Sequence, residues 1–181
     1  LRAKTFDSAK INSQYLAESS MTETIDGMIV FQTNQATDDH LPEDSTAFVE
    51  NITIKRRGTV AVLCKCGTLL MAFAESGDIK LLAQWLKPGD QIKYNGLQSY
   101  DKSIHLERLS IIKALPDKRR PRCQECDATL KSMGTDQPLR CPKCRQQFPA
   151  EWECVERKPP YIGWVQPPKD SMRHLAKPTS W

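Results

Sequence analysis

The pairs Cys123-Gln124-Glu125-Cys126 and Cys141-Pro142-Lys143-Cys144 form the most specific pattern in this chain. Each pair offers two sulfur ligands from one tight turn, and their spacing is typical of a four-thiolate zinc site on a short β-hairpin. Two disulfides are the competing interpretation, but the chain has an odd number of cysteines, seven, and no signal-peptide pattern at its start. We therefore predict a zinc ribbon over residues 116–154, with these four cysteines holding one structural zinc ion.

The other three cysteines have no matching pair and are Cys64, Cys66 and Cys154. The first two lie in an alternating, strand-like stretch. We interpret them as reduced thiols in a core or at a strand edge.

Positive charge is concentrated in the C-terminal part of the chain. The net charge is +4, yet residues 113–181 hold 14 Lys and Arg against 8 Asp and Glu. Four thiolates and one zinc ion would lower this excess by two. A basic stretch leads into the first cysteine pair and consists of Lys113, Lys118, Arg119, Arg120 and Arg122. It is either a solvated connector or a patch that contacts RNA phosphates, and charge alone favours neither.

Length and hydrophobicity limit the class of protein. A ribbon of about forty residues cannot bury a sufficient core without its metal, so 181 residues imply at least two modules. No run approaches the roughly 18 apolar residues of a membrane span. We expect a soluble, cytoplasmic protein that does not bind membranes. The chain begins at Leu1 within polar, helix-like sequence, which suggests that it derives from a longer polypeptide.

Residues 46–115 predict a compact β domain. Strands are expected at residues 48–54, 58–65, 69–74, 91–97 and 104–112, with a helix over residues 78–86 and Asp78 as its N-cap. Three strands, a helix and two further strands are the element order of an OB-fold barrel. Another kind of small β-barrel is the alternative, and the chain as a whole is predicted to be mainly β.

Polar and extended segments flank this domain. We expect a broken helix within residues 1–22, then a buried strand over residues 25–32 that runs into a polar loop. The loop is either a binding segment or a hydrogen-bonded turn, since Asn, Thr and Asp favour turns. Residues 155–181 form a proline-rich tail with Tyr161, Trp164 and Trp181. We expect it to pack on a neighbouring domain; the alternative is that its rings stack on bases while its cations contact phosphates. These cations are Arg157, Lys158, Lys169, Arg173 and His174.

A barrel, a zinc ribbon and a basic connector together are typical of proteins that handle nucleic acids. No phosphate-binding loop, nucleophile elbow or metal-bound general-base motif is present in the sequence. The residues alone therefore predict a substrate-binding module without a complete catalytic centre.

The polar loop gives a more specific indication. Gln32-Thr33-Asn34-Gln35-Ala36-Thr37-Asp38-Asp39-His40-Leu41 resembles the Arg/Gln-Thr-Asn-Gln-x-Thr-Asp-x-His-Leu signature of the archaeal isoleucine-tRNA 2-agmatinylcytidine synthetases. The tail, with Trp164-x-x-Pro167-Pro168 and Arg173-His174-Leu175-x-Lys177-Pro178, is similar to the end of that family. The order of modules also matches, so the resemblance covers nearly the whole chain.

The resemblance implies an ATP-dependent ligase that attaches agmatine to C2 of the wobble cytidine of an isoleucine tRNA. Residues 1–45 would end a ferredoxin-like domain, and an absent kinase-like domain would bind ATP and magnesium, so this chain alone should be inactive. The barrel would grip the acceptor side of the tRNA by its shape, while the ribbon reaches toward the anticodon. The substrate pocket would lie near Thr33, Asn34, Gln35, Thr37, Asp38 and His40, whose polar groups suit a guanidinium or a flipped base.

Two hypotheses of other classes remain. A non-enzymatic RNA-binding adaptor also pairs a barrel with a zinc ribbon, but it has no evident use for a polar cluster outside the barrel. A purely structural clamp between protein subunits is the third.

Overall fold

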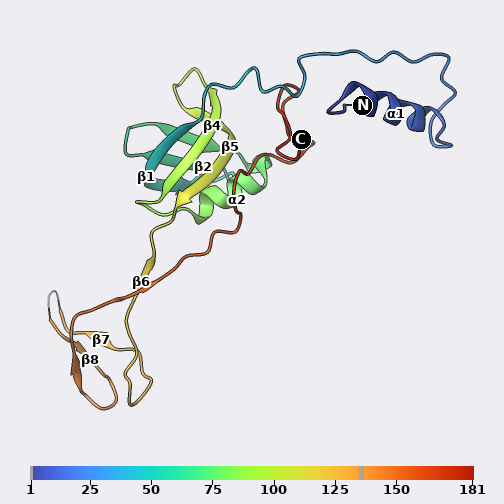
Figure 1. Cartoon of the computed structure of the whole chain (residues 1–181). Helices are drawn as coiled ribbons and strands as arrows, with labels where there is room; N and C mark the ends of the chain where they lie inside the picture. Colours follow the sequence, from blue (N-terminus) through green and yellow to red (C-terminus); the bar gives the residue numbers. More distant parts are fainter. Residues whose placement is uncertain (1, 135–136) are drawn as a thin grey trace.

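The computed structural model describes residues 2–134 and 137–181 and is mainly β, as predicted. Figure 1 shows a barrel near the middle of the molecule, a small sheet at the far end of a thin stem, and a separate N-terminal helix. Among the described residues, no helix is long and apolar enough to cross a membrane.

Five strands close the barrel in the order β1-β2-β3-β5-β4. They are β1 (Ser45–Ile54), β2 (Val60–Cys64), β3 (Leu69–Ala72), β4 (Gln91–Gln98) and β5 (Ile104–Lys113). All neighbours are antiparallel except β3 and β5, which are parallel. A short 3₁₀ helix, η1 (Ala74–Ser76), and the helix α2 (Asp78–Trp85) connect β3 to β4. The five predicted strands and the helix are confirmed, with no bound more than three residues away.

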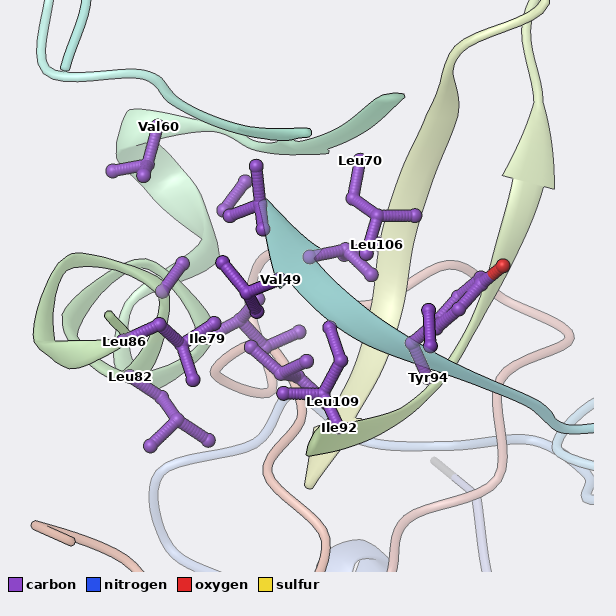
Figure 2. Close-up of a cluster of buried hydrophobic side chains, with 14 of the residues drawn as sticks. Val49, Val60, Leu70, Ile79, Leu82, Leu86, Ile92, Tyr94, Leu106 and Leu109 are labelled. Atoms are coloured by element: carbon purple, nitrogen blue, oxygen red, sulfur yellow. The ribbon is translucent and has the colours of Figure 1, made fainter. Parts of the chain in front are cut away.

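The barrel core is filled mostly from alternate positions of the strands, as the period of two predicts, with a break in β5, where Leu106 and Leu109 are both buried. In β2, Val60, Val62 and Cys64 are completely buried. The apolar face of α2, with Ile79 and Leu82, packs against this core, and Figure 2 shows these side chains beside those of the strands. Burying one such aliphatic side chain contributes about 1.5–3 kcal/mol, so these contacts are the main stabilisation of the domain.

The predicted N-cap of α2 is wrong by one residue. Gly77 occupies the N-cap position with φ +54°, and Asp78 is the first residue of the helix. The chain turns directly from η1 into α2, and this turn requires a backbone conformation that glycine adopts most easily. The Asp78 carboxylate instead accepts a hydrogen bond of 2.7 Å from the Tyr161 hydroxyl of the tail.

The ribbon is a small sheet on a two-stranded stem. Its strands are β7 (Lys131–Ser132), β8 (Leu139–Arg140) and β9 (Gln147–Phe148), and Leu130 and Leu139 form its own core with the cysteines. The stem pairs β6 (Asp117–Arg119) with β10 (Glu153–Val155) in antiparallel fashion. The two chains that join the ribbon to the barrel therefore lie side by side (Figure 1).

A single buried carboxylate fastens both chains of the stem to the barrel. Asp90 accepts hydrogen bonds from the backbone N–H groups of Lys87 (2.8 Å) and Leu115 (2.9 Å). Nη1 of Arg157, just after β10, donates to both Asp90 oxygens at 2.9 and 3.0 Å. The Arg157 guanidinium also lies 3.9 Å from the ring centroid of Trp85. We call Asp90, Arg157 and these donors the Asp90 junction.

The N-terminal region differs from its prediction. The helix α1 (Phe6–Ala17) forms, with the Thr5 side chain as its cap, but it buries no residue. The predicted strand over residues 25–32 is absent, and Ile29 and Phe31 are 76% and 74% exposed. A strand needs a neighbour to pair with, and a closed barrel offers no free edge. The apolar, β-branched composition of this stretch is therefore not sufficient to make it a strand.

The tail packs on the barrel, as predicted. Val165 exchanges two backbone hydrogen bonds with Leu109 of β5, at 2.8 and 3.0 Å, and is buried. Two of the cations considered as phosphate contacts pair with carboxylates of the barrel domain instead. Arg157 belongs to the Asp90 junction, and Arg173 Nε donates to Glu107 Oε1 at 2.5 Å.

Candidate functional site

The four predicted metal ligands come together at one end of the ribbon. The Sγ atoms of Cys123, Cys126, Cys141 and Cys144 all lie within 4.8 Å of one another. A tetrahedral site with Zn–S distances of 2.3 Å has sulfurs about 3.8 Å apart, and the Cys123 and Cys144 sulfurs are 3.6 Å apart. This separation is far longer than the roughly 2.05 Å of a disulfide. The set could therefore hold a metal ion, and the disulfide interpretation finds no support.

The four thiols do not share one electrostatic environment: the neighbouring sulfurs raise the pKa of Cys126 and Cys144, whereas Cys141 is shifted the other way. Burial acts to raise the pKa of the Cys141 thiol, but backbone N–H groups of Cys144 and Lys143, together with the neighbouring sulfurs, lower it to about 6. A thiolate is the form that binds a metal. The backbone of the second CxxC pair thus favours the thiolate form of Cys141.

The Thr-Asn-Gln segment, residues 33–40, is an ordered turn held against the tail. The Thr37 hydroxyl donates to the Asn34 carbonyl at 2.8 Å, and the Gln35 N–H donates to Thr33 Oγ1 at 3.2 Å. The backbone N–H of Ala36 donates to the His174 carbonyl at 3.1 Å. The hydrogen-bonded turn expected as one alternative is therefore present, and it leaves open whether the segment also binds a ligand.

Its side chains fall into three groups. Asp38 is engaged by Nη2 of Arg108, at 2.5 Å. Both ring nitrogens of His40 are shielded from solvent and have no hydrogen-bond partner within the described residues. Thr33, Asn34 and Gln35 are exposed, and within residues 2–134 and 137–181 the two side-chain amides form no hydrogen bond. These amides are the polar groups that are free to meet a ligand.

The predicted basic stretch is partly paired with carboxylates. Arg119 Nε donates to Glu153 Oε2 at 2.9 Å across the stem, and Arg122 Nη1 donates to Asp127 Oδ2 at 2.5 Å. The Arg120 guanidinium lies 5.5 Å from the Trp152 ring. Within the described residues, Lys113 and Lys118 form no ion pair. Since exposed ion pairs contribute only about 0–1 kcal/mol, these two carboxylates hold their guanidinium groups only weakly.

Sequence reasoning missed the residues that hold the Thr-Asn-Gln segment in place. Arg108 lies in the middle of β5, and its partner is 70 residues away, so no local pattern points to it. The tail residues His174 and Leu175 act through their backbone carbonyls, which carry no side-chain signature. The only available signal was the tail motif that contains them.

Comparison with known proteins gives consistent matches. The chain is 31% identical over 179 residues to the isoleucine-tRNA 2-agmatinylcytidine synthetase TiaS of Ignisphaera aggregans, covering 86% of this chain and 38% of that protein. It is 33% identical over 150 residues to TiaS of Saccharolobus islandicus, covering 75% of this chain and 33% of that protein. The chain thus spans about two fifths or less of the length of these curated relatives. No protein-family model matches.

Solved structures agree with these relatives. Apo TiaS, described as a tRNA agmatidine synthetase, aligns with a TM-score of 0.64 and 26% identity, covering 81% of this chain and 40% of that one. A complex of TiaS with its isoleucine tRNA and ATP aligns with a TM-score of 0.61 and 25% identity, covering 80% and 38%.

Proposed function

Because the chain corresponds to the C-terminal portion of the archaeal isoleucine-tRNA 2-agmatinylcytidine synthetase family, we propose that it is the tRNA-binding portion of an ATP-dependent ligase. That enzyme attaches agmatine to C2 of the wobble cytidine of an isoleucine tRNA, in the cytoplasm. The observation that carries the proposal is the extent of the match, which covers most of this chain in both sequence and fold. We propose that ATP and magnesium bind in the portion of the full-length enzyme that this chain does not span.

Each module has a role in this proposal. Residues 1–45 end a ferredoxin-like domain, residues 46–115 are an OB-fold, residues 116–154 a zinc ribbon and residues 155–181 an extended tail. The OB-fold is supported by the closed five-stranded barrel with a helix between β3 and β4. Zinc is supported by the spacing of the four sulfurs, because soft thiolates in a tetrahedral set select it over harder ions.

The substrate site is proposed at the Thr-Asn-Gln segment, at Thr33, Asn34, Gln35, Thr37, Asp38 and His40. Amide oxygens accept hydrogen bonds from the planar donors of a guanidinium, and amide N–H groups donate to the acceptors of cytosine. The exposed, unbound amides of Asn34 and Gln35 support this role most directly. His40 adds two ring nitrogens that lack a partner among the described residues.

The tRNA surface is proposed at Lys113, Lys118, Arg119, Arg120 and Arg122, which line the end of the barrel and the stem. Replacing Arg119, Arg120 and Arg122 with Gln should weaken tRNA binding and flatten its salt dependence. Each lost phosphate contact removes up to about one unit from the slope of log K against log salt. Lys4→Gln with Lys10→Gln, on and just before the exposed helix α1, is the matched control. An unchanged slope would show that this stretch is a solvated connector and does not contact the RNA phosphates.

The activity itself is tested in the enzyme that contains this chain. The enzyme is incubated with a transcript of the isoleucine tRNA, ATP and agmatine, and the nucleosides are analysed by mass spectrometry. We expect agmatine to be incorporated at the wobble cytidine, and a transcript with uridine at that position to stay unmodified. Binding of tRNA without any incorporation would favour the RNA-binding adaptor instead.

A further inference from the structure

The Thr-Asn-Gln segment adopts a backbone that it cannot hold alone. Ala36 and Asp38 have φ values of +56° and +67°, in the left-handed region that non-glycine residues rarely occupy. Such conformations persist where surrounding contacts enforce them. Here the contacts come from the tail, because the N–H groups of Ala36 and Asp38 donate to the carbonyls of His174 (3.1 Å) and Leu175 (2.9 Å).

One carboxylate joins this turn to two other parts of the chain. Asp38 Oδ1 accepts from the backbone N–H of Lys177 at 2.6 Å, and Oδ2 accepts from Arg108 Nη2 at 2.5 Å. Arg108 Nη2 also donates to the Lys177 carbonyl at 2.8 Å. The side chains of Asp38 and Arg108 are each only 19% exposed. Turn, barrel and tail therefore meet at one point, which we call the Asp38 junction.

The hydrogen bonds that Asp38 accepts within the chain limit its ability to bind a substrate. Each of its oxygens already accepts one hydrogen bond, one of them from a guanidinium, and the side chain is only 19% exposed, so little of the carboxylate surface is open to a guanidinium ligand. Asn34 and Gln35, four and three residues earlier, are exposed, and their amides are unbound within the described residues. The direct binding role therefore falls to the amides and not to the carboxylate.

We propose that Asp38 and Arg108 are positioning residues, and that the backbone of residues 174–177 forms one side of the substrate site by fixing the turn that presents Asn34 and Gln35. The identity of the ligand, a guanidinium or a cytosine ring, rests on the proposed function. The junction itself does not, because it is a property of this chain.

The first test uses the 181-residue chain and measures backbone hydrogen exchange. Asp38→Ala, Arg108→Ala and the double variant should each raise exchange at the amides of residues 36 and 38 by about tenfold or more. Asp39→Ala is the matched control, because it removes a neighbouring exposed carboxylate outside the junction, and it should leave exchange unchanged. Unchanged exchange in Asp38→Ala, with the barrel still folded, would overturn the proposal.

The second test uses the enzyme that contains this chain. Asp38→Ala and Arg108→Ala should lower kcat/KM for agmatine by similar factors, and the double variant should be no worse than the less active single variant, because both break one unit. Arg108→Lys should recover part of the loss, since an ammonium can still donate to Asp38. Full activity in Arg108→Ala with a large loss in Asp38→Ala would show direct substrate binding by Asp38 and refute a positioning role. If the unaltered enzyme attaches no agmatine, the proposed function fails. The hydrogen-exchange result then decides by itself whether Asp38 and Arg108 hold the turn in place.

Discussion

Replacing Arg157 with methionine tests whether the Asp90 junction stabilises the barrel. The substitution keeps an apolar side chain of similar length beside Trp85 but removes every hydrogen bond of the guanidinium. Asp90 is fully buried and the Arg157 side chain is 6% exposed. The variant would leave a buried carboxylate with only the backbone donors of Lys87 and Leu115.

The expected cost follows from this burial. Removing one partner of a buried ion pair costs about 3–5 kcal/mol, because the remaining charge is left without compensation. The two backbone donors that remain favour the lower end, about 3 kcal/mol. Arg119→Met is the matched control, since Arg119 and Glu153 are 67% and 44% exposed, and it should cost at most about 1 kcal/mol.

Urea unfolding followed by tryptophan fluorescence measures both variants. With an m-value of about 1–3 kcal/mol/M, Arg157→Met should lower the unfolding midpoint by about 1–3 M without changing m. Trp85, whose ring the guanidinium covers, lies at the junction and reports on it. A midpoint shift no larger than that of Arg119→Met would refute the reasoning. The Asp90 junction would then contribute little to the free energy of unfolding.

Three further predictions follow from other parts of the molecule. Cys141→Ser should lower bound zinc below one ion per chain and unfold the ribbon while the barrel stays folded; full zinc content by metal analysis would contradict the four-thiolate site. Gly96→Ala should cost about 1–3 kcal/mol in thermal unfolding, because a Cβ there would lie 2.2 Å from the backbone oxygen of His105; an unchanged melting temperature would contradict that packing. Among thiols outside the ribbon, Cys66 should be alkylated far faster than Cys64 at pH 8, as mass spectrometry can follow. A threonine hydroxyl lowers the pKa of Cys66, whereas burial raises the pKa of Cys64 to about 12, so equal rates would contradict both assignments.

The barrel and the cysteine cluster could be predicted because their signals are local. Period-two alternation and turn residues mark each strand of the barrel, and the spacing of the two CxxC pairs contains the geometry of the cluster. The strand predicted over residues 25–32, which does not form, shows where local signals are insufficient. Composition reports whether a segment suits a sheet, but it does not report whether a neighbouring strand exists to pair with it.

The Asp90 and Asp38 junctions could not be predicted. They join residues that are far apart in the sequence, and the groups that form them belong to no recognisable sequence motif. Asp90 and Arg157 are 67 residues apart, and Asp38 and Lys177 are 139 residues apart. Arg157 was expected either in a packed tail or on a phosphate, and nothing in its neighbours indicates a buried carboxylate as its partner. The Asp38 junction depends partly on backbone carbonyls, which every residue possesses.

The contact between the Thr-Asn-Gln segment and the tail has a consequence for the order in which parts of the chain form during synthesis. A ribosome adds residues at about 5–20 per second and releases domains from the N-terminal side, so the barrel and ribbon can fold before residues 174–177 emerge. The left-handed turn at Ala36 and Asp38 must wait for these partners. A product cut short just before His174 would keep the Asp90 junction and the pairing of Val165 with the barrel, but its turn would be unformed. The Thr-Asn-Gln segment is thus synthesised before the barrel but reaches its final conformation only after the barrel has been made.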